Sequence, residues 1–103
     1  MARRSRAELD ALVAEAIVDA YDEHEQLSGF HVMLEEHLSV PFTTIVLGVE
    51  VTVKKIDLLP GSGIVAICTR GPHRQAIGIC DLPLPTPSQE GSEWIDAYSH
   101  WVG

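Results

Sequence analysis

The stretch "VEVTVKKIDLLPGSGIVAICTR", residues 49–70, decides the fold of this chain. Val49, Val51 and Val53 recur at every second position, which is the period of a strand with one buried face. A second β-branched run, "GIVAICTR" at residues 63–70, begins at the last glycine of the turn signal "PGSG". Two such runs around a Pro/Gly turn predict an antiparallel hairpin.

Further strands are predicted on both sides of this hairpin. "FTTIVLG" precedes it and ends at Gly48, and "QAIGICDL" follows it after the turn signal "RGPHR". Residues 42–84 therefore predict four short antiparallel strands joined by tight turns. This pattern favours a small, strongly curved sheet or an SH3-like barrel.

The two cysteines are predicted to be free. If the "RGPHR" turn pairs Arg70 with Gln75, Cys80 lies opposite Val65, and Cys68 and Cys80 point to different faces of the sheet. Side chains on different faces cannot form a disulfide. We expect two small core residues in a reducing cytoplasm.

Residues 6–38 are predicted to form two helices. Ser5 and Glu8 match a capping box at the start of the first helix, and Asp22 with Glu25 offers a second cap of the same spacing. Between the caps lies an amphipathic stripe with helical spacing, made of Leu9, Leu12, Val13, Ala16, Ile17, Ala20 and Tyr21.

The second helix is predicted to pack closely on its surroundings. Gly29 lies in its middle and costs about 1 kcal/mol relative to Ala there, so we interpret it as a close helix contact. Pro41 disfavours helix at Val40 and ends the segment. The inward positions are predicted to be Leu27, Phe30, Leu34 and Leu38.

The chain is predicted to end in a short helix over residues 88–102, capped by Ser92. Its apolar face would consist of Trp94, Ile95, Tyr98 and Trp101, and would pack back onto the rest. With 103 residues the chain is one domain, residues 1–103. The predicted fold class is α+β: an N-terminal helical pair on a small SH3-like antiparallel β-barrel, with a short C-terminal helix.

Composition and charge narrow the function. Fifteen Asp and Glu against seven Lys and Arg give a net charge of −8, which repels phosphate backbones and disfavours nucleic-acid binding. The longest apolar runs are about five residues, against about 20 for a membrane span, and the basic start lacks an apolar leader core. We expect a cytoplasmic monomer without membrane or nucleic-acid partners.

The acids are unevenly distributed. Between Arg6 and Lys54 there is no Lys or Arg, and this stretch holds ten carboxylates. The acids of the first helix have spacings of 7, 4, 3 and 1 that place them on one face, where like charges destabilise the helix; they are Glu8, Glu15, Asp19, Asp22 and Glu23. A solubilising face is the commoner explanation for such a run. A cation site explains the missing basic residues better, and clustered carboxylates are hard oxygen donors that suit Ca²⁺.

The sequence gives less support to an EF-hand, a transition-metal site or a catalytic site. No EF-hand loop occurs, so ligands must come from separate elements. His24, His31 and Glu35 share a helical face and offer an alternative transition-metal site. No G-x-S-x-G elbow accompanies the Ser, His and Asp residues. Adjacent Glu35 and Glu36 diverge by about 100° on a helix. We expect no enzymatic activity.

Residues 17–43, "IVDAYDEHEQLSGFHVMLEEHLSVPFT", resemble the N-terminal signature of the CcbP-type calcium-binding proteins of cyanobacteria. The shared features are I-V-D-A-Y, an acidic E-x-E-Q, Gly29 before an aromatic residue, and P-F-T at residues 41–43. The terminal segment from Trp94 to Val102 agrees loosely. The resemblance implies a helix-plus-barrel protein that binds Ca²⁺ as a buffer or sensor.

The ligands that the resemblance implies are surface carboxylates of the helical region. Asp22 is this sequence's own addition, with a side chain available for capping. Members often carry a longer acidic connection between barrel strands, where this chain has only Asp57, so one site would be missing or weak. The full candidate set is Asp19, Asp22, Glu23, Glu25, Glu35 and Glu36.

A second function class remains open at this stage. The small barrel or the acidic helical face would act as an interaction module for a basic protein partner, without a physiological metal. Such binding would be sensitive to salt and indifferent to a chelator.

Overall fold

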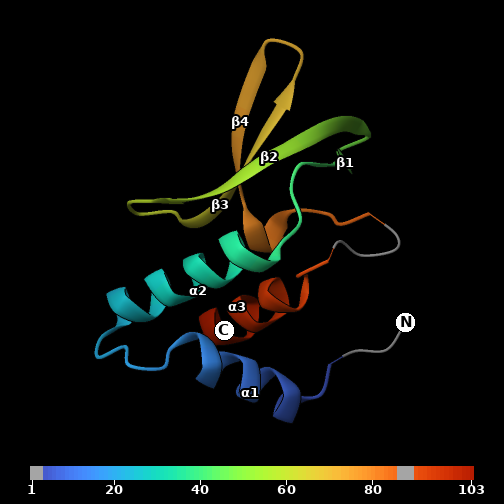
Figure 1. Ribbon diagram of the computed structural model, residues 1–103. Helices are drawn as coiled ribbons and strands as arrows, with labels where there is room; N and C mark the ends of the chain where they lie inside the picture. The colour runs from blue at the N-terminus through green and yellow to red at the C-terminus, as the bar shows by residue number, and fades with distance from the viewer. Residues whose placement is uncertain (1–3, 86–89) are drawn as a thin grey trace.

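The computed structural model describes residues 4–85 and 90–103. Three α-helices, four strands and one 3₁₀ turn make up these residues (Figure 1). In chain order they are α1 (Arg6–Ala16), α2 (Glu23–His37), β1 (Phe42–Val46), β2 (Val49–Leu59), β3 (Gly63–Arg70), β4 (His73–Gly78), η1 (Ile79–Asp81) and α3 (Glu93–Val102).

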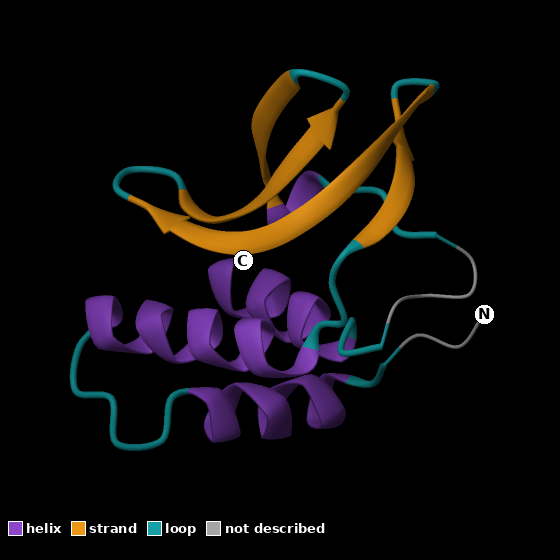
Figure 2. Cartoon of the chain, turned by 45° about the horizontal axis from the view of Figure 1, so that its top comes forward, coloured by secondary structure: helices purple, strands orange, loops and turns teal. Residues whose placement is uncertain are grey.

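The helices lie on one face of the sheet, in a layer two helices deep. Helix α2 contacts β2 and β3, and α3 contacts both α2 and η1. Helix α1 packs on α3 and α2, on the side of the helical layer away from the sheet (Figure 2). The predicted α+β class with a short C-terminal helix is therefore confirmed. None of the described helices is long and apolar enough to cross a membrane.

The sheet is an open meander and does not form the closed barrel that the strand pattern favoured. Its strand order is β1-β2-β3-β4 with antiparallel neighbours, and β1 and β4 do not pair within the described residues. A register shift between Val53 and Lys55 marks a bulge in β2. After Gly78 the chain turns into η1 instead of continuing along the sheet. Strand β4 therefore ends at Gly78 as an edge strand of the open sheet.

The predicted register of the last hairpin is wrong by two residues. Arg70 pairs with His73, not with Gln75, so only Gly71 and Pro72 form the turn. Gly71 has a φ of 56°, which a two-residue turn of type II′ requires at its first central position. The strand residue opposite Val65 is consequently Gly78.

The cysteines are free, as expected, but their environments differ. Cys68 is buried in the core and Cys80 is exposed in η1, so the prediction of two core cysteines is wrong for Cys80. Burial raises the pKa of the Cys68 thiol. Partial burial of the sulfur and the Asp81 carboxylate raise the pKa of the Cys80 thiol, and a hydrogen bond with Ser99 opposes them.

Helix α1 begins as predicted and ends earlier. The Ser5–Glu8 capping box is present in both directions, at 3.1 and 3.3 Å. The helix ends at Ala16 with Ile17 as its C-cap, so Ala20 and Tyr21 of the predicted apolar stripe are not part of it. The Tyr21 side chain is 88% exposed. Asp19 has a φ of 63°, a left-handed conformation that Asp tolerates better than most residues and that no helix continues through. Asp19 and Asp22 therefore do not share a helical face with Glu8 and Glu15.

Helix α2 begins where its cap predicts. Asp22 Oδ1 accepts a hydrogen bond of 2.8 Å from the backbone N–H of Glu25. The predicted close contact at Gly29 is confirmed, because a Cβ there would collide with the carbonyl oxygen of Ala16. The inward residues Phe30 and Leu34 are fully buried and Leu38 is 3% exposed.

The core joins α2 and α3 to the inner face of the sheet. Its largest fully buried side chains include Phe30, Leu34, Val53 and Ile64. Helix α3 contributes the predicted apolar face, with Trp94, Ile95 and Tyr98 buried. Ser92 stands at the N-cap position without a side-chain cap hydrogen bond. The predicted start at residue 88 lies outside the described residues.

Candidate cation site

The junction of α1 and α2, from residue 17 to the first turn of α2, carries four of the six candidate carboxylates. Asp19 lies within the link, Asp22 caps α2, and Glu23 and Glu25 belong to its first turn. Glu25 Oε2 accepts a hydrogen bond of 3.5 Å from the backbone N–H of Tyr21. All four acidic residues are exposed. The local backbone thus presents four acids at one end of the helical layer.

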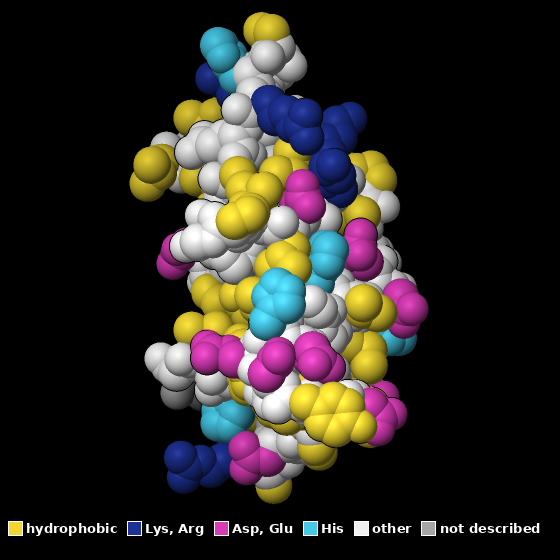
Figure 3. Space-filling view, turned by 90° about the vertical axis from the view of Figure 1, so that its left-hand side faces the viewer, with side chains coloured by type: hydrophobic (Ala, Val, Ile, Leu, Met, Phe, Trp, Pro, Cys, Tyr) yellow, Lys and Arg dark blue, Asp and Glu magenta, His cyan; other side chains and the backbone are white. Residues whose placement is uncertain are grey.

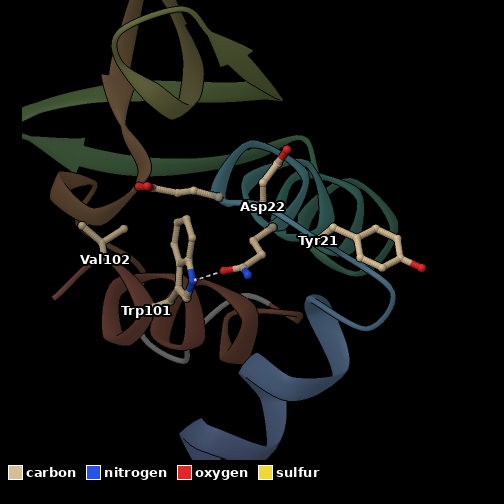
Figure 4. A pocket seen from close by; sticks show the side chains of 6 residues that line it. Tyr21, Asp22, Trp101 and Val102 are labelled. Atoms are coloured by element: carbon tan, nitrogen blue, oxygen red, sulfur yellow. Dashed lines mark hydrogen bonds between the residues drawn. The ribbon is translucent and has the colours of Figure 1, made fainter.

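Two of these acids border a surface hollow of about 460 Å³. The hollow lies between the start of α2 and the end of α3 (Figure 4). The Trp101 indole faces α2 across it, whereas Tyr21 points outward, away from Trp101 (Figure 4). The residues lining the hollow are Tyr21, Asp22, Glu23, Gln26, Trp101 and Val102.

The remaining candidates, Glu35 and Glu36, lie at the other end of α2. Glu35 follows Glu23 by twelve positions, which at 1.5 Å per residue is about 18 Å along the helix axis. A single Ca²⁺ ion holds oxygens at about 2.3–2.6 Å, so it cannot use both ends of α2. The six candidates therefore form two groups: an α2 N-terminal group (Asp19, Asp22, Glu23, Glu25) and an α2 C-terminal pair (Glu35, Glu36).

The C-terminal pair has one histidine contact. Glu35 Oε1 lies 3.6 Å from His31 Nε2, and that nitrogen is buried without a hydrogen-bond partner. Three or more His, Cys, Asp or Glu side chains placed to hold a metal occur nowhere in residues 4–85 and 90–103. The transition-metal alternative at His24, His31 and Glu35 therefore has no assembled site there. The acids of the N-terminal group also stand apart in this conformation.

Among residues 4–85 and 90–103, no Lys, Arg or His forms an ion pair with the acids of the N-terminal group. The ion pairs of the described residues join Arg4 to Asp96, His100 to Asp10 and His31 to Glu35. On the face shown in Figure 3, Asp and Glu gather over the helical end, and most of the Lys and Arg lie at the sheet end. The negative charge at the junction is thus left to solvent and to any cation that it attracts.

The donor chemistry of the junction fits Ca²⁺. Asp22 and Glu23 offer carboxylate oxygens, and Gln26 adds an amide oxygen to the same hollow. Carboxylate and amide oxygens are the ligands that Ca²⁺ prefers, and its coordination geometry is flexible. The described residues thus supply suitable donors without a preformed cage.

Gln26 and Trp101 were not among the candidates predicted from sequence. Gln26 follows Asp22 by four residues and so lies on the same side of α2, which was a readable signal. Trp101 is 75 residues from Gln26, and nothing local to either residue indicates their contact.

Comparisons with known proteins agree with the donor chemistry. A family model described as calcium binding, of the CcbP type, matches residues 10–102. Neither curated proteins nor solved structures gave a match. The matched region runs from α1 through the whole sheet to the end of α3, well beyond the segment 17–43 that carries the sequence resemblance. The chain belongs to the CcbP calcium-binding family.

Proposed function

We propose that this protein binds Ca²⁺ through its surface carboxylates and acts as a calcium buffer or sensor. The principal site is the α2 N-terminal group, in which Asp22 and Glu23 border the hollow and Asp19 and Glu25 belong to the same junction. The α2 C-terminal pair, Glu35 and Glu36, is a separate and weaker locus. The observation that carries the proposal is a group of exposed acids that has no cationic partner in the described part of a chain of a calcium-binding family.

The physical advantage of this site is that its charges stay in water. Exposed carboxylates carry no burial cost in the ion-free protein, and a bound Ca²⁺ relieves the repulsion among them. Mg²⁺ demands a stricter octahedral geometry and gives up its water reluctantly, so it should bind this open group less well. The proposed role is binding rather than catalysis, and the two free cysteines are consistent with a reducing cytoplasm.

Calorimetric titration with CaCl₂ tests the proposal with a variant that keeps the fold. In Asp22→Asn/Glu23→Gln, the asparagine still caps α2 because Asn caps as well as Asp does. The variant loses two charges at the hollow, so we expect calcium affinity to fall by about tenfold or more. Glu50→Gln on β2 is the matched control, since it removes an exposed charge far from the junction and should leave the titration unchanged.

The outcomes separate the two groups of acids. If Glu35→Gln/Glu36→Gln weakens binding more than the double variant at the hollow does, the principal site is at the other end of α2. If the unaltered protein gives no heat and no thermal shift at millimolar CaCl₂, the proposal is wrong.

A second candidate function is an interaction module for a basic protein partner. Exposed apolar side chains accompany the junction acids: Val18 is 67% exposed and Tyr21 is 88% exposed. Acids beside exposed apolar groups suit a basic, partly apolar partner. Binding of such a partner would persist in EDTA and weaken with salt, whereas a calcium-dependent association would be lost in EDTA.

A further inference from the structure

Gln26 connects the acidic hollow to the C-terminal helix. Its side chain lines the hollow together with Asp22 and Glu23. Its Oε1 atom accepts a hydrogen bond of 3.1 Å from the indole Nε1–H of Trp101 (Figure 4). The Gln26 amide oxygen, a suitable calcium ligand, therefore already accepts a hydrogen bond from a side chain of α3.

Trp101 is in turn part of an aromatic cluster that belongs to the core. Its ring centroid lies 5.1 Å from that of Phe30 and 6.1 Å from that of Tyr98. The indole is only partly buried, because it stands at the last turn of α3, beside the 59% exposed Val102. A change in its hydrogen bond would therefore act on the end of α3 while the buried part of the helix stays packed.

A cation and an N–H donor that bind the same amide oxygen weaken each other, although that oxygen has two lone pairs. An ion coordinated at 2.3–2.6 Å brings positive charge close to the partly positive indole hydrogen, which it repels. We propose that Ca²⁺ at the junction takes the Gln26 amide oxygen from the Trp101 indole, so that ion binding releases the last turn of α3 from α2. The inference rests on the proposed function and adds the regulation of that same site.

Thermodynamic linkage determines the sign of the mutational effects. If the ion and the indole compete, removal of the indole donor must favour the ion by as much as the ion disfavours the hydrogen bond. A hydrogen bond of ordinary net strength corresponds to about two- to tenfold in affinity. Trp101→Phe, which keeps an aromatic ring against Phe30, should thus tighten calcium binding by about two- to tenfold. Gln26→Leu, which removes the amide oxygen, should weaken it.

Tryptophan fluorescence reports the release directly. In Trp94→Phe the remaining indole is Trp101, and we expect CaCl₂ to move its emission to longer wavelength as the indole gains water. In Trp101→Phe the remaining indole is Trp94, which stacks on His37 away from the hollow and should not respond. Trp94→Phe is also the matched control for calorimetry, since it alters the same helix and should leave calcium affinity unchanged.

The unaltered protein provides a test that needs no variant. In ¹H–¹⁵N spectra, the indole N–H resonance of Trp101 should shift during a calcium titration, in step with the calorimetric heat. Calcium heat without a shift of that resonance, or a calcium affinity that Trp101→Phe leaves equal or lower, would overturn the inference and leave the proposed function standing. Absence of any calcium heat in the unaltered protein would instead count against the proposed function.

Discussion

Three residues shape the junction between α1 and α2. Asp19 has a left-handed φ of 63°, which turns the chain after α1. Asp22 caps α2 by accepting a hydrogen bond from the backbone N–H of Glu25. Gly29 then lets the backbone of α2 pass directly beside the carbonyl oxygen of Ala16. An Asp side chain is a good N-cap, and a Gly without a side chain allows close backbone contact. The exposed acids are held at this end of the molecule because these three residues place the turn there.

Gly29→Ala tests the close approach at residue scale. Helix propensity alone predicts a gain of about 1 kcal/mol, because Ala is the better helix former. The added Cβ would collide with the backbone of Ala16, so we expect a net loss of about 1–3 kcal/mol in the free energy of unfolding. Urea denaturation measures the difference. Ser28→Ala, one position earlier in α2, is the control and should be close to neutral; a Gly29→Ala protein as stable as the original would contradict the proposed clash.

At the scale of elements, α3 fastens the helical layer to the β2–β3 hairpin. The Tyr98 hydroxyl accepts a hydrogen bond of 3.3 Å from the backbone N–H of Ile64, at the start of β3. A Cβ on Gly63 would lie 2.7 Å from that hydroxyl, so the turn leaves room for it. Trp94 and Ile95 fill the core from the same helix. The short C-terminal helix thus closes one end of the sheet.

Tyr98→Phe tests this attachment. The ring remains, but the buried N–H of Ile64 loses its partner, so we expect about 1–3 kcal/mol less stability in urea or thermal unfolding. Tyr21→Phe removes the same atom from a side chain that is 88% exposed, and stability should not change. Equal stabilities of the two variants would show that the Tyr98 hydroxyl does not attach α3 to the sheet.

At the scale of the whole molecule, charge is divided between the two layers. The sheet carries the exposed Lys54, Lys55, Arg70 and Arg74, whereas residues 7–53 contain no Lys or Arg. Repulsion among the helical acids destabilises the compact state, because four of the six described Lys and Arg residues lie on the sheet and only Arg4 and Arg6 lie near the helices. Repulsion among these acids therefore lowers the free energy of unfolding, and an added cation can restore part of it.

Thermal unfolding at increasing salt concentration tests whether repulsion among the acids destabilises the protein. NaCl screens exposed charges over about 8 Å at physiological ionic strength, so the melting temperature should rise with NaCl, by roughly 4–8 °C for each ~1 kcal/mol relieved. CaCl₂ at equal ionic strength should raise it further. MgCl₂ is the control for divalent charge alone. A melting temperature that falls with NaCl would show that attractive ion pairs, not repulsion, dominate.

Much of the fold was predictable because its signals are short-range. The capping box at Ser5, the cap at Asp22 and the alternation in β2 each involve neighbours within a few residues. Predictions failed where two local signals competed or where a long-range contact decided the result. Helix α1 stopped at Ala16 although the apolar period continued to Tyr21, because the backbone at Asp19 turns left-handed.

The sequence by itself determined the α+β class, the free cysteines and the concentration of acids, without Lys or Arg, between Arg6 and Lys54. Only the tertiary structure decided that the sheet stays open and that the six candidate acids fall into two groups at opposite ends of α2. It also brought Gln26 to Trp101 across 75 residues. Caps and alternation act between neighbours along the chain, whereas a shared hollow exists only after packing has brought distant segments together.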